Sequence, residues 1–172
     1  ANVIGGCMGS YGPGTIDPLT NKPFGTNFPV ITINDMVNAQ YKLLDHLKIE
    51  KLFAVAGGSM GGMQVLQFVS NFPNKAKVAL PIACTASHSA QNIAFNELGR
   101  QAIMSDINWK DGLYDGKTFN PDKGLAVARM AAHITYLSKK GLQEKFGRNL
   151  QERSDLKFGF DADFQIESYL RY

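Results

Sequence analysis

The chain has 172 residues, of which 44% are hydrophobic, and its 18 basic and 15 acidic residues give a net charge of +3. This length and composition are typical of one soluble globular domain with a core of its own. The mixed charges predict neither a nucleic-acid nor a membrane surface, and no apolar run reaches the roughly 20 residues that span a bilayer. We expect no signal peptide at the start of these residues. Two cysteines form neither a disulfide framework nor a zinc site, so we expect no metal and a cytoplasmic location.

The first residues predict the end of a strand followed by a long loop. Residues 1–4 (Ala-Asn-Val-Ile) have no cap or initiator methionine before them, so we expect the chain to start within a domain. Residues 5–29 are rich in Gly, Pro, Asn and Thr, and loops of this length are usually functional or disordered. Cys7 lies in this loop without a histidine or basic residue near it in the sequence, which favours an inert thiol.

A helix is predicted to follow. Thr32 and Asp35 have the spacing of a capping box, in which the Thr hydroxyl accepts a hydrogen bond from the first turn and the carboxylate reaches back. Apolar residues then recur at helical spacing, and the predicted inner face carries Met36, Val37, Ala39, Leu43, Leu44 and Leu47. His46 lies off this face near the helix end, where an exposed imidazole is the ordinary explanation.

Residues 51–62 (KLFAVAGGSMGG) predict a strand, a sharp turn and the start of a helix. The spacing Gly-x-Ser-x-Gly is typical of the nucleophile elbow of α/β-hydrolases. We predict that side chains at Gly57 and Gly61 would collide with neighbouring backbone, and that Ser59 projects alone at the carboxyl edge of the sheet. The helix N-terminus favours negative charge there, so the backbone N–H of Met60 is a candidate oxyanion donor.

Two other interpretations of these glycines are weaker. Ala56, Gly58 and Gly61 loosely match the Gly-x-Gly-x-x-Gly turn that binds dinucleotides, but the acidic residue expected about 20 residues further on is missing. No P-loop lysine follows the glycines either. A turn without a catalytic role is the structural alternative, and the strand before it and the helix after it favour the elbow.

The elbow helix and the next strand complete a strand–helix–strand pattern. We predict that the helix turns Met63, Leu66 and Val69 inward. The nearly continuous apolar run Val78–Cys84 is typical of a strand that is buried on both faces of a parallel sheet. Strands that alternate with helices in this way predict the α/β class, with a mostly parallel, doubly wound sheet.

After residue 86 the pattern changes to helices, at residues 87–105, 121–137 and around 142–146. Helices inserted after a sheet strand are typical of a lid that excludes water and shapes a pocket. The last stretch is more polar and shows no closing element. We therefore predict a partial core at residues 1–86, a helical lid at 87–150 and a polar lid continuation or flexible segment at 151–172.

Arg129 stands among small and apolar residues in the second of these helices. An arginine in such surroundings needs a partner, and a carboxylate best matches its planar guanidinium. That carboxylate belongs either to a ligand or to an aspartate of the chain, and the residues alone leave both interpretations open.

Six separated blocks of sequence together closely resemble the homoserine O-acetyltransferase family. They are residues 2–13, 57–64, 89–97, 124–130, 133–138 and 167–172. The resemblance covers essentially the whole chain, so it is more specific than the elbow alone. It implies an α/β-hydrolase fold with a helical lid and an acyltransferase of methionine biosynthesis.

The resemblance also implies roles for single residues. Ser59 matches the nucleophile that takes the acetyl group from acetyl-CoA and passes it to the hydroxyl of L-homoserine, and Met60 matches the second oxyanion-hole amide. Arg129 matches the lid arginine that holds the homoserine carboxylate. Acetyl-CoA is then a cosubstrate, no cofactor stays bound, and the enzyme is a homodimer.

The rest of the catalytic triad is not found. In this fold the triad follows the order Ser, Asp, His, and in the family the last two lie beyond the lid. The three histidines, His46, His88 and His133, are poor substitutes because of where they stand in the sequence. We therefore expect a central piece of an enzyme, inactive or nearly so alone, with the triad Asp and His and the first oxyanion donor supplied by the remaining polypeptide.

Three alternatives stay open. A relative that uses succinyl-CoA, or that acylates serine, would share these residues, so the chain does not decide the acyl donor. An esterase or thioesterase of the same fold would let water resolve the acyl-enzyme. A catalytically inert fragment would keep the elbow without its chemistry.

Overall fold

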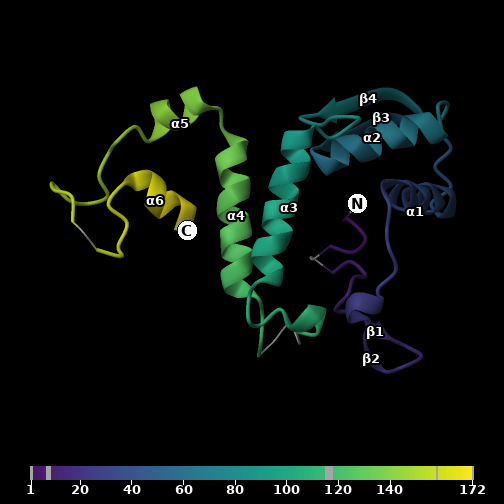
Figure 1. Cartoon of the computed structure of the whole chain (residues 1–172). Coiled ribbons are helices and arrows are strands. Elements are labelled where there is room, and N and C mark those ends of the chain that lie inside the picture. Colours follow the sequence, from purple (N-terminus) through teal and green to yellow (C-terminus); the bar gives the residue numbers. More distant parts are fainter. Residues whose placement is uncertain (1, 7–8, 115–117, 158, 172) are drawn as a thin grey trace. The chain divides into compact units, whose positions relative to one another are not determined.

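The computed structural model describes residues 2–6, 9–114, 118–157 and 159–171, so Cys7 lies outside the described residues (Figure 1). These residues form two compact units, 1–88 and 89–172. The first contains β1 (Ile16–Asp17), β2 (Lys22–Pro23), a 3-10 turn η1 (Gly25–Asn27), α1 (Ile33–His46), β3 (Leu52–Gly58), α2 (Met60–Asn71) and β4 (Ala76–Ile82). The second contains α3 (Ala90–Met104), a 3-10 turn η2 (Lys110–Gly112), α4 (Asp122–Tyr136), α5 (Lys139–Lys145) and α6 (Gln165–Arg171).

The strand end predicted at residues 1–4 is wrong for the part that the structure describes. Residues 2 and 3 are irregular, and a turn begins at Ile4. Gly5 has a φ of +86°, and its N–H donates to the Tyr11 carbonyl oxygen at 2.7 Å, which closes a loop in place of a strand. The loop predicted over residues 5–29 is confirmed in outline, but it contains the β1–β2 hairpin and η1.

The capping box predicted at the start of α1 is confirmed. Thr32 Oγ1 accepts a hydrogen bond from the Asp35 N–H at 3.2 Å, and Asp35 Oδ2 accepts one from the Thr32 N–H at 2.8 Å. The Thr32 hydroxyl and then its N–H, both bonded to the carboxylate, hold the pKa of Asp35 below its ordinary value. Of the predicted inner face, Met36 and Val37 are buried, but Leu43 and Leu47 are 49% and 55% exposed and Ala39 is exposed, so the prediction is wrong for these three residues. His46 is exposed at the helix end as predicted.

Strands β3 and β4 are parallel neighbours, with Leu52 opposite Ala76 and Gly58 opposite Ile82. Helix α2 connects them and lies against one face of the pair, so the predicted strand–helix–strand unit is confirmed (Figure 1). The predicted burial of β4 on both faces is wrong, because Val78, Leu80 and Ile82 are 40%, 48% and 57% exposed. Within the described part of the first unit, α2 is the helix that packs on β4, and no second helical layer covers the other face of the strand pair.

In the second unit α3 and α4 lie side by side, which confirms the two long helices predicted there (Figure 1). Their backbones approach closely at Gly124, where a Cβ would lie 2.3 Å from the Ala102 carbonyl oxygen. The carboxylate of Asp106 caps the start of α4, because Oδ2 accepts a hydrogen bond from the Gly124 N–H at 2.8 Å and Oδ1 accepts one from the Asn108 N–H at 2.9 Å. These hydrogen bonds, the Asn108 one first, lower the pKa of Asp106.

The last stretch has more structure than predicted, since α6 is a closing helix that the sequence did not indicate. The Glu167 carboxylate accepts hydrogen bonds from the N–H groups of Asp163 and Phe164, both at 2.8 Å, and Arg153 pairs with Asp163. The Tyr169 ring lies 4.9 Å from the Phe146 ring between centroids. The assignment of residues 87–150 and 151–172 to a lid stays a prediction.

Candidate functional site: the nucleophile elbow

Ser59 joins β3 to α2 in a backbone conformation that residues other than glycine rarely adopt, with φ 55° and ψ −121°. Strain of this kind costs of order 1–3 kcal/mol and persists only where the surroundings fix it. Here the Ser59 N–H donates to the Ile82 carbonyl oxygen at 2.9 Å, and the Ser59 carbonyl oxygen accepts from the N–H groups of Gly62 at 2.9 Å and Met63 at 3.2 Å. A strained serine between a strand and a helix is the geometry of a nucleophile elbow.

The glycines around Ser59 provide room for this turn. A Cβ on Gly57 would lie 2.3 Å from the Gly61 carbonyl oxygen, so the collision predicted for Gly57 is confirmed. The prediction for Gly61 is wrong, because a Cβ there would meet nothing within 4 Å. The second close approach falls at Gly62, where a Cβ would lie 2.6 Å from Cys84 Sγ. Sequence reasoning missed it because Cys84 follows β4, outside the motif.

The start of α2 leaves hydrogen-bond donors open beside Ser59. Met60 is the first residue of the helix, so its N–H has no acceptor within the helix. Ser59 makes no side-chain cap hydrogen bond, and its hydroxyl has no partner among the described residues. Ser59 is exposed and Met60 is 38% exposed. An exposed hydroxyl and a free helix N–H are the two groups that attack on a carbonyl and stabilisation of the resulting oxyanion require.

The described part of the chain supplies no base for Ser59. His46 is exposed at the end of α1, and His88 is exposed in the segment after β4. His133 lies in α4, where its Nδ1 is 3.0 Å from the Arg129 carbonyl oxygen. No histidine or carboxylate among the described residues hydrogen-bonds to the Ser59 hydroxyl, so the triad partners that the sequence did not identify are not identified by this geometry either.

Arg129 lies on α4 with its side chain exposed. It pairs with no carboxylate in the described ranges, where the ion pairs are Arg100–Glu97, Lys140–Glu144 and Arg153–Asp163. The internal ion pair that the sequence left open is therefore not formed with any carboxylate of the described residues. The guanidinium remains available to a ligand carboxylate, and that role stays a prediction.

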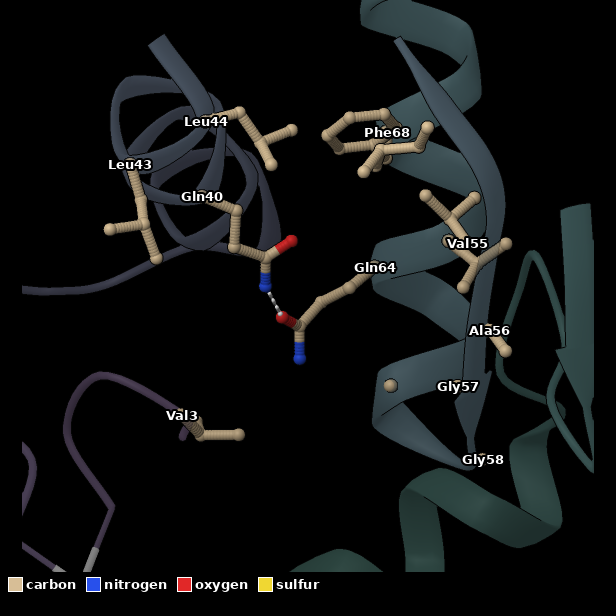
Figure 2. A pocket seen from close by; sticks show the side chains of 13 residues that line it. Val3, Gln40, Leu43, Leu44, Val55, Ala56, Gly57, Gly58, Gln64 and Phe68 are labelled. Atoms are coloured by element: carbon tan, nitrogen blue, oxygen red, sulfur yellow. Dashed lines mark hydrogen bonds between the residues drawn. The ribbon is translucent and has the colours of Figure 1, made fainter. Parts of the chain in front are cut away.

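A cavity of about 540 Å³ lies between α1, α2 and β3, bordered by the elbow glycines Gly57, Gly58 and Gly61 (Figure 2). Most of its lining is apolar, but two amides face each other across it. Gln40 Nε2 on α1 donates to Gln64 Oε1 on α2 at 2.5 Å, and Gln64 is only 7% exposed. Ser59 itself does not line the cavity.

The predicted inner face of α2 is therefore wrong. The structure buries Gln64, Val65 and Phe68, whereas Met63, Leu66 and Val69 are half-buried. The reason is that α1 packs on the side of α2 that carries Gln64 and Phe68. Helix α2 carries apolar residues on two sides, so its periodicity did not reveal which side α1 would cover. Nothing in the sequence indicated a buried glutamine.

None of the helices in the described residues is both long enough and apolar enough to cross a membrane. No group of three or more His, Cys, Asp and Glu side chains in the same residues is arranged to hold a metal ion.

A sequence profile of the alpha/beta hydrolase fold matches residues 6–165. The chain is also 80% identical over 172 residues to the homoserine O-acetyltransferase of Pelagibacter ubique (strain HTCC1062), and 64% identical to that of Mesorhizobium japonicum. These alignments cover 100% of this chain but 46% and 44% of the two relatives, so the chain spans less than half the length of the curated relatives it matches. The resemblance found in the six sequence blocks is confirmed.

Solved structures agree with this fold. A homoserine O-acetyltransferase from Bacillus anthracis superposes with a TM-score of 0.81 and 23% identity, over 94% of this chain and 43% of that one. Esterase E22 superposes with a TM-score of 0.77 and 30% identity, over 94% of this chain and 44% of that one. The partial α/β-hydrolase fold predicted from the sequence is confirmed.

Proposed function

The chain belongs to the alpha/beta hydrolase fold family, and we propose that it is the part of a homoserine O-acetyltransferase that carries the nucleophile, Ser59. The observation that carries the proposal is the strained, exposed serine at φ 55° between β3 and α2. The 80% identity to a relative of that name supports the choice of reaction within the family. The proposed setting is methionine biosynthesis in the cytoplasm.

In the proposed reaction Ser59 Oγ attacks the thioester carbonyl of acetyl-CoA while a base accepts its proton. The C–S bond then breaks, and CoA takes the proton from the base and leaves as the thiol. The hydroxyl of L-homoserine next gives its proton to the same base and attacks the acetyl-serine. The bond between Ser59 Oγ and the acetyl carbon breaks, Ser59 regains the proton, and O-acetylhomoserine leaves. The Met60 N–H stabilises the oxyanion in both steps, and removing one such donor typically lowers kcat by about 10²–10³-fold. Its position at an uncapped helix start supports this role.

Arg129 is proposed to hold the carboxylate of L-homoserine, which supports transfer to an amino-acid hydroxyl in preference to water. Its exposure and its lack of an ion pair within the described residues are consistent with that role. The remaining part of the longer polypeptide is proposed to supply the triad Asp and His, the first oxyanion donor and the choice between acetyl and succinyl donors. We also propose a homodimer, on the basis of the same resemblance.

The test uses the complete polypeptide that contains this chain, with acetyl-CoA and L-homoserine. The expected products are free CoA and O-acetylhomoserine, and Ser59→Ala is expected to lower kcat by at least about 10³-fold. Incubation with acetyl-CoA alone should add one acetyl group to Ser59, as measured by peptide mass spectrometry. Acetylation at another residue, or full activity of the Ser59→Ala variant, would contradict the proposal.

An esterase is the second candidate, because esterase E22 shares the fold at 30% identity. The two functions differ in what resolves the acetyl-serine, since water gives acetate and homoserine gives the ester. Arg129→Ala separates them: for a transferase we expect acetyl-Ser59 to form at the normal rate and transfer to homoserine to fall. If acetate is the main product of the wild type at saturating homoserine, the esterase is the better assignment.

A further inference from the structure

Strand β4 ends at a strained residue of its own. Ala83 directly follows Ile82, the last residue of β4, and has a φ of +47°. This left-handed conformation is uncommon for residues other than glycine, because the Cβ atom crowds the neighbouring carbonyl oxygen. The side chain of Ala83 is exposed, so burial of its methyl group does not account for the conformation. Strain of this kind persists only where the surrounding structure fixes it, and it is concentrated at functional sites.

The strained backbone of Ala83 is next to the hydrogen bond that holds Ser59. The Ile82 carbonyl oxygen accepts this bond from the Ser59 N–H at 2.9 Å, one residue beyond the point where Gly58 lies opposite Ile82. The Ile82 carbonyl and the Ala83 nitrogen belong to one peptide plane, and rotation about φ of Ala83 turns this plane relative to the chain that follows. The direction of the accepting oxygen therefore depends on the conformation of Ala83.

The residue after Ala83 lies against the other side of the elbow. A Cβ on Gly62, in the first turn of α2, would lie 2.6 Å from Cys84 Sγ and 2.7 Å from Cys84 Cβ. If β4 continued as a regular strand, its next residues would extend past the end of the sheet. The chain bends at Ala83 instead, and Cys84 packs against the start of the helix.

We propose that Ala83 is a positioning residue for the nucleophile, Ser59. Its left-handed backbone turns the Ile82 carbonyl oxygen to the Ser59 N–H and places Cys84 against the first turn of α2. The hydrogen bond fixes the backbone of Ser59, and the contact fixes the helix start that carries the Met60 N–H. The effect on catalysis rests on the proposed function, whereas the effect on the Ser59 backbone does not.

Three variants of the complete polypeptide test this proposal. Ala83→Val places a β-branched side chain at a positive φ, where such residues are outliers, so we expect the backbone to leave the left-handed region. Ala83→Gly removes the methyl group and adopts this φ readily. Lys48→Val is the matched control, because Lys48 is also exposed and left-handed, with a φ of +57°. It precedes β3, whereas Ser59 follows the other end of that strand.

Hydrogen–deuterium exchange of the Ser59 N–H, resolved by fragmenting the elbow peptide in a mass spectrometer, is the first readout because it does not depend on activity. We expect about tenfold faster exchange in Ala83→Val, and exchange within about twofold of wild type in Ala83→Gly and Lys48→Val. Unchanged exchange in Ala83→Val, or an equal increase in the two valine variants, would overturn the proposal.

Ala83→Gly decides the question if Ala83→Val fails to fold. Glycine normally destabilises a folded chain relative to alanine, but at a positive φ it relieves strain. We therefore expect Ala83→Gly to have a Tm equal to or above that of wild type, with unchanged exchange of the Ser59 N–H. A lower Tm, or faster exchange at Ser59, would overturn the proposal.

The second readout is the split between kcat and KM with acetyl-CoA and L-homoserine. A positioning role predicts that Ala83→Val lowers kcat by roughly ten- to a hundredfold with little change in KM for homoserine, and that the conservative variant Ala83→Gly restores kcat. Lys48→Val should lower Tm without lowering kcat, which separates positioning from a general loss of stability. An equal fall of kcat in both Ala83 variants would overturn the proposal. If the wild type transfers no acetyl group while exchange at Ser59 responds as expected, the proposed function fails and the inference about the Ser59 backbone stands.

Discussion

Helices α2 and α4 begin in opposite ways. At α2 no side chain caps the first turn, and the residue before the helix is the strained Ser59. At α4 the first turn is capped by Asp106, a carboxylate from the connection after α3. Both starts approach a neighbouring backbone closely through a glycine, Gly57 before α2 and Gly124 within α4.

The difference distinguishes a candidate catalytic site at the start of α2 from a purely structural contact at the start of α4. Open N–H groups at a helix start attract negative charge, so a capping carboxylate would compete with any oxyanion that develops there. At α2 the chain leaves the N–H of Met60 without an acceptor in the helix, and it fixes the serine by backbone sterics. At α4 it satisfies such N–H groups internally and obtains a stable contact between two helices. Three substitutions test whether close packing or capping is what distinguishes the two starts.

The largest effect is expected for Gly57→Ala. A Cβ there would lie 2.3 Å from the Gly61 carbonyl oxygen, and a backbone atom cannot move aside without unfolding the elbow. We expect a loss of about 3 kcal/mol or more in the free energy of unfolding and no detectable acetylation of Ser59. Chemical denaturation of the complete polypeptide measures the first, and peptide mass spectrometry measures the second.

Gly61→Ala is the control, because a Cβ at that position meets nothing within 4 Å and lies in a helix, where alanine is favoured over glycine. We expect unchanged or slightly higher stability. If both variants lost stability equally, the glycine pattern of the motif would matter for a reason other than the close approach found at Gly57.

The sequence predicted the elements that depend on local patterns. The capping box of Thr32 and Asp35, the elbow turn and the long helices of the second unit all follow from spacing within about one or two helical turns. What it missed depends on atoms from distant parts of the chain. Gly62 is required by Cys84, and the buried face of α2 is chosen by α1.

The same limit explains the sheet. An apolar run such as Val78–Cys84 indicates burial on both faces only when a helix covers each face, and the described part of the first unit has α2 on one. The cap of α4 is a further case, because Asp106 lies 18 residues before Gly124 in the sequence and forms no recognisable capping box. Local sequence therefore identified Ser59 but not its surroundings.

Gly124→Ala should have the next largest effect. Its Cβ would lie 2.3 Å from the Ala102 carbonyl oxygen, so α3 and α4 must separate slightly. We expect a loss of about 1–3 kcal/mol in the free energy of unfolding, with Ser59 still able to form its acetyl ester. Gly99→Ala is the control on the facing helix, since its Cβ would make an ordinary contact at 3.7 Å. A Gly124→Ala variant as stable as Gly99→Ala would mean that the two helices adjust freely.

The smallest effect is expected at the cap of α4 and is visible as a pH dependence. The Asp106 carboxylate accepts N–H groups of Asn108 and Gly124, which lower its pKa in the folded chain below the ordinary 3.8. Its contribution to stability is therefore complete above that value and is lost as the pH falls through the lower, folded pKa. Asp106→Asn removes the charge, so Tm of the variant should fall less steeply than wild type below about pH 4 and be modestly lower near pH 7. Parallel Tm curves for the two proteins over this range would show that the charge at this helix start is not what stabilises it, and the contrast with α2 would then rest on packing alone.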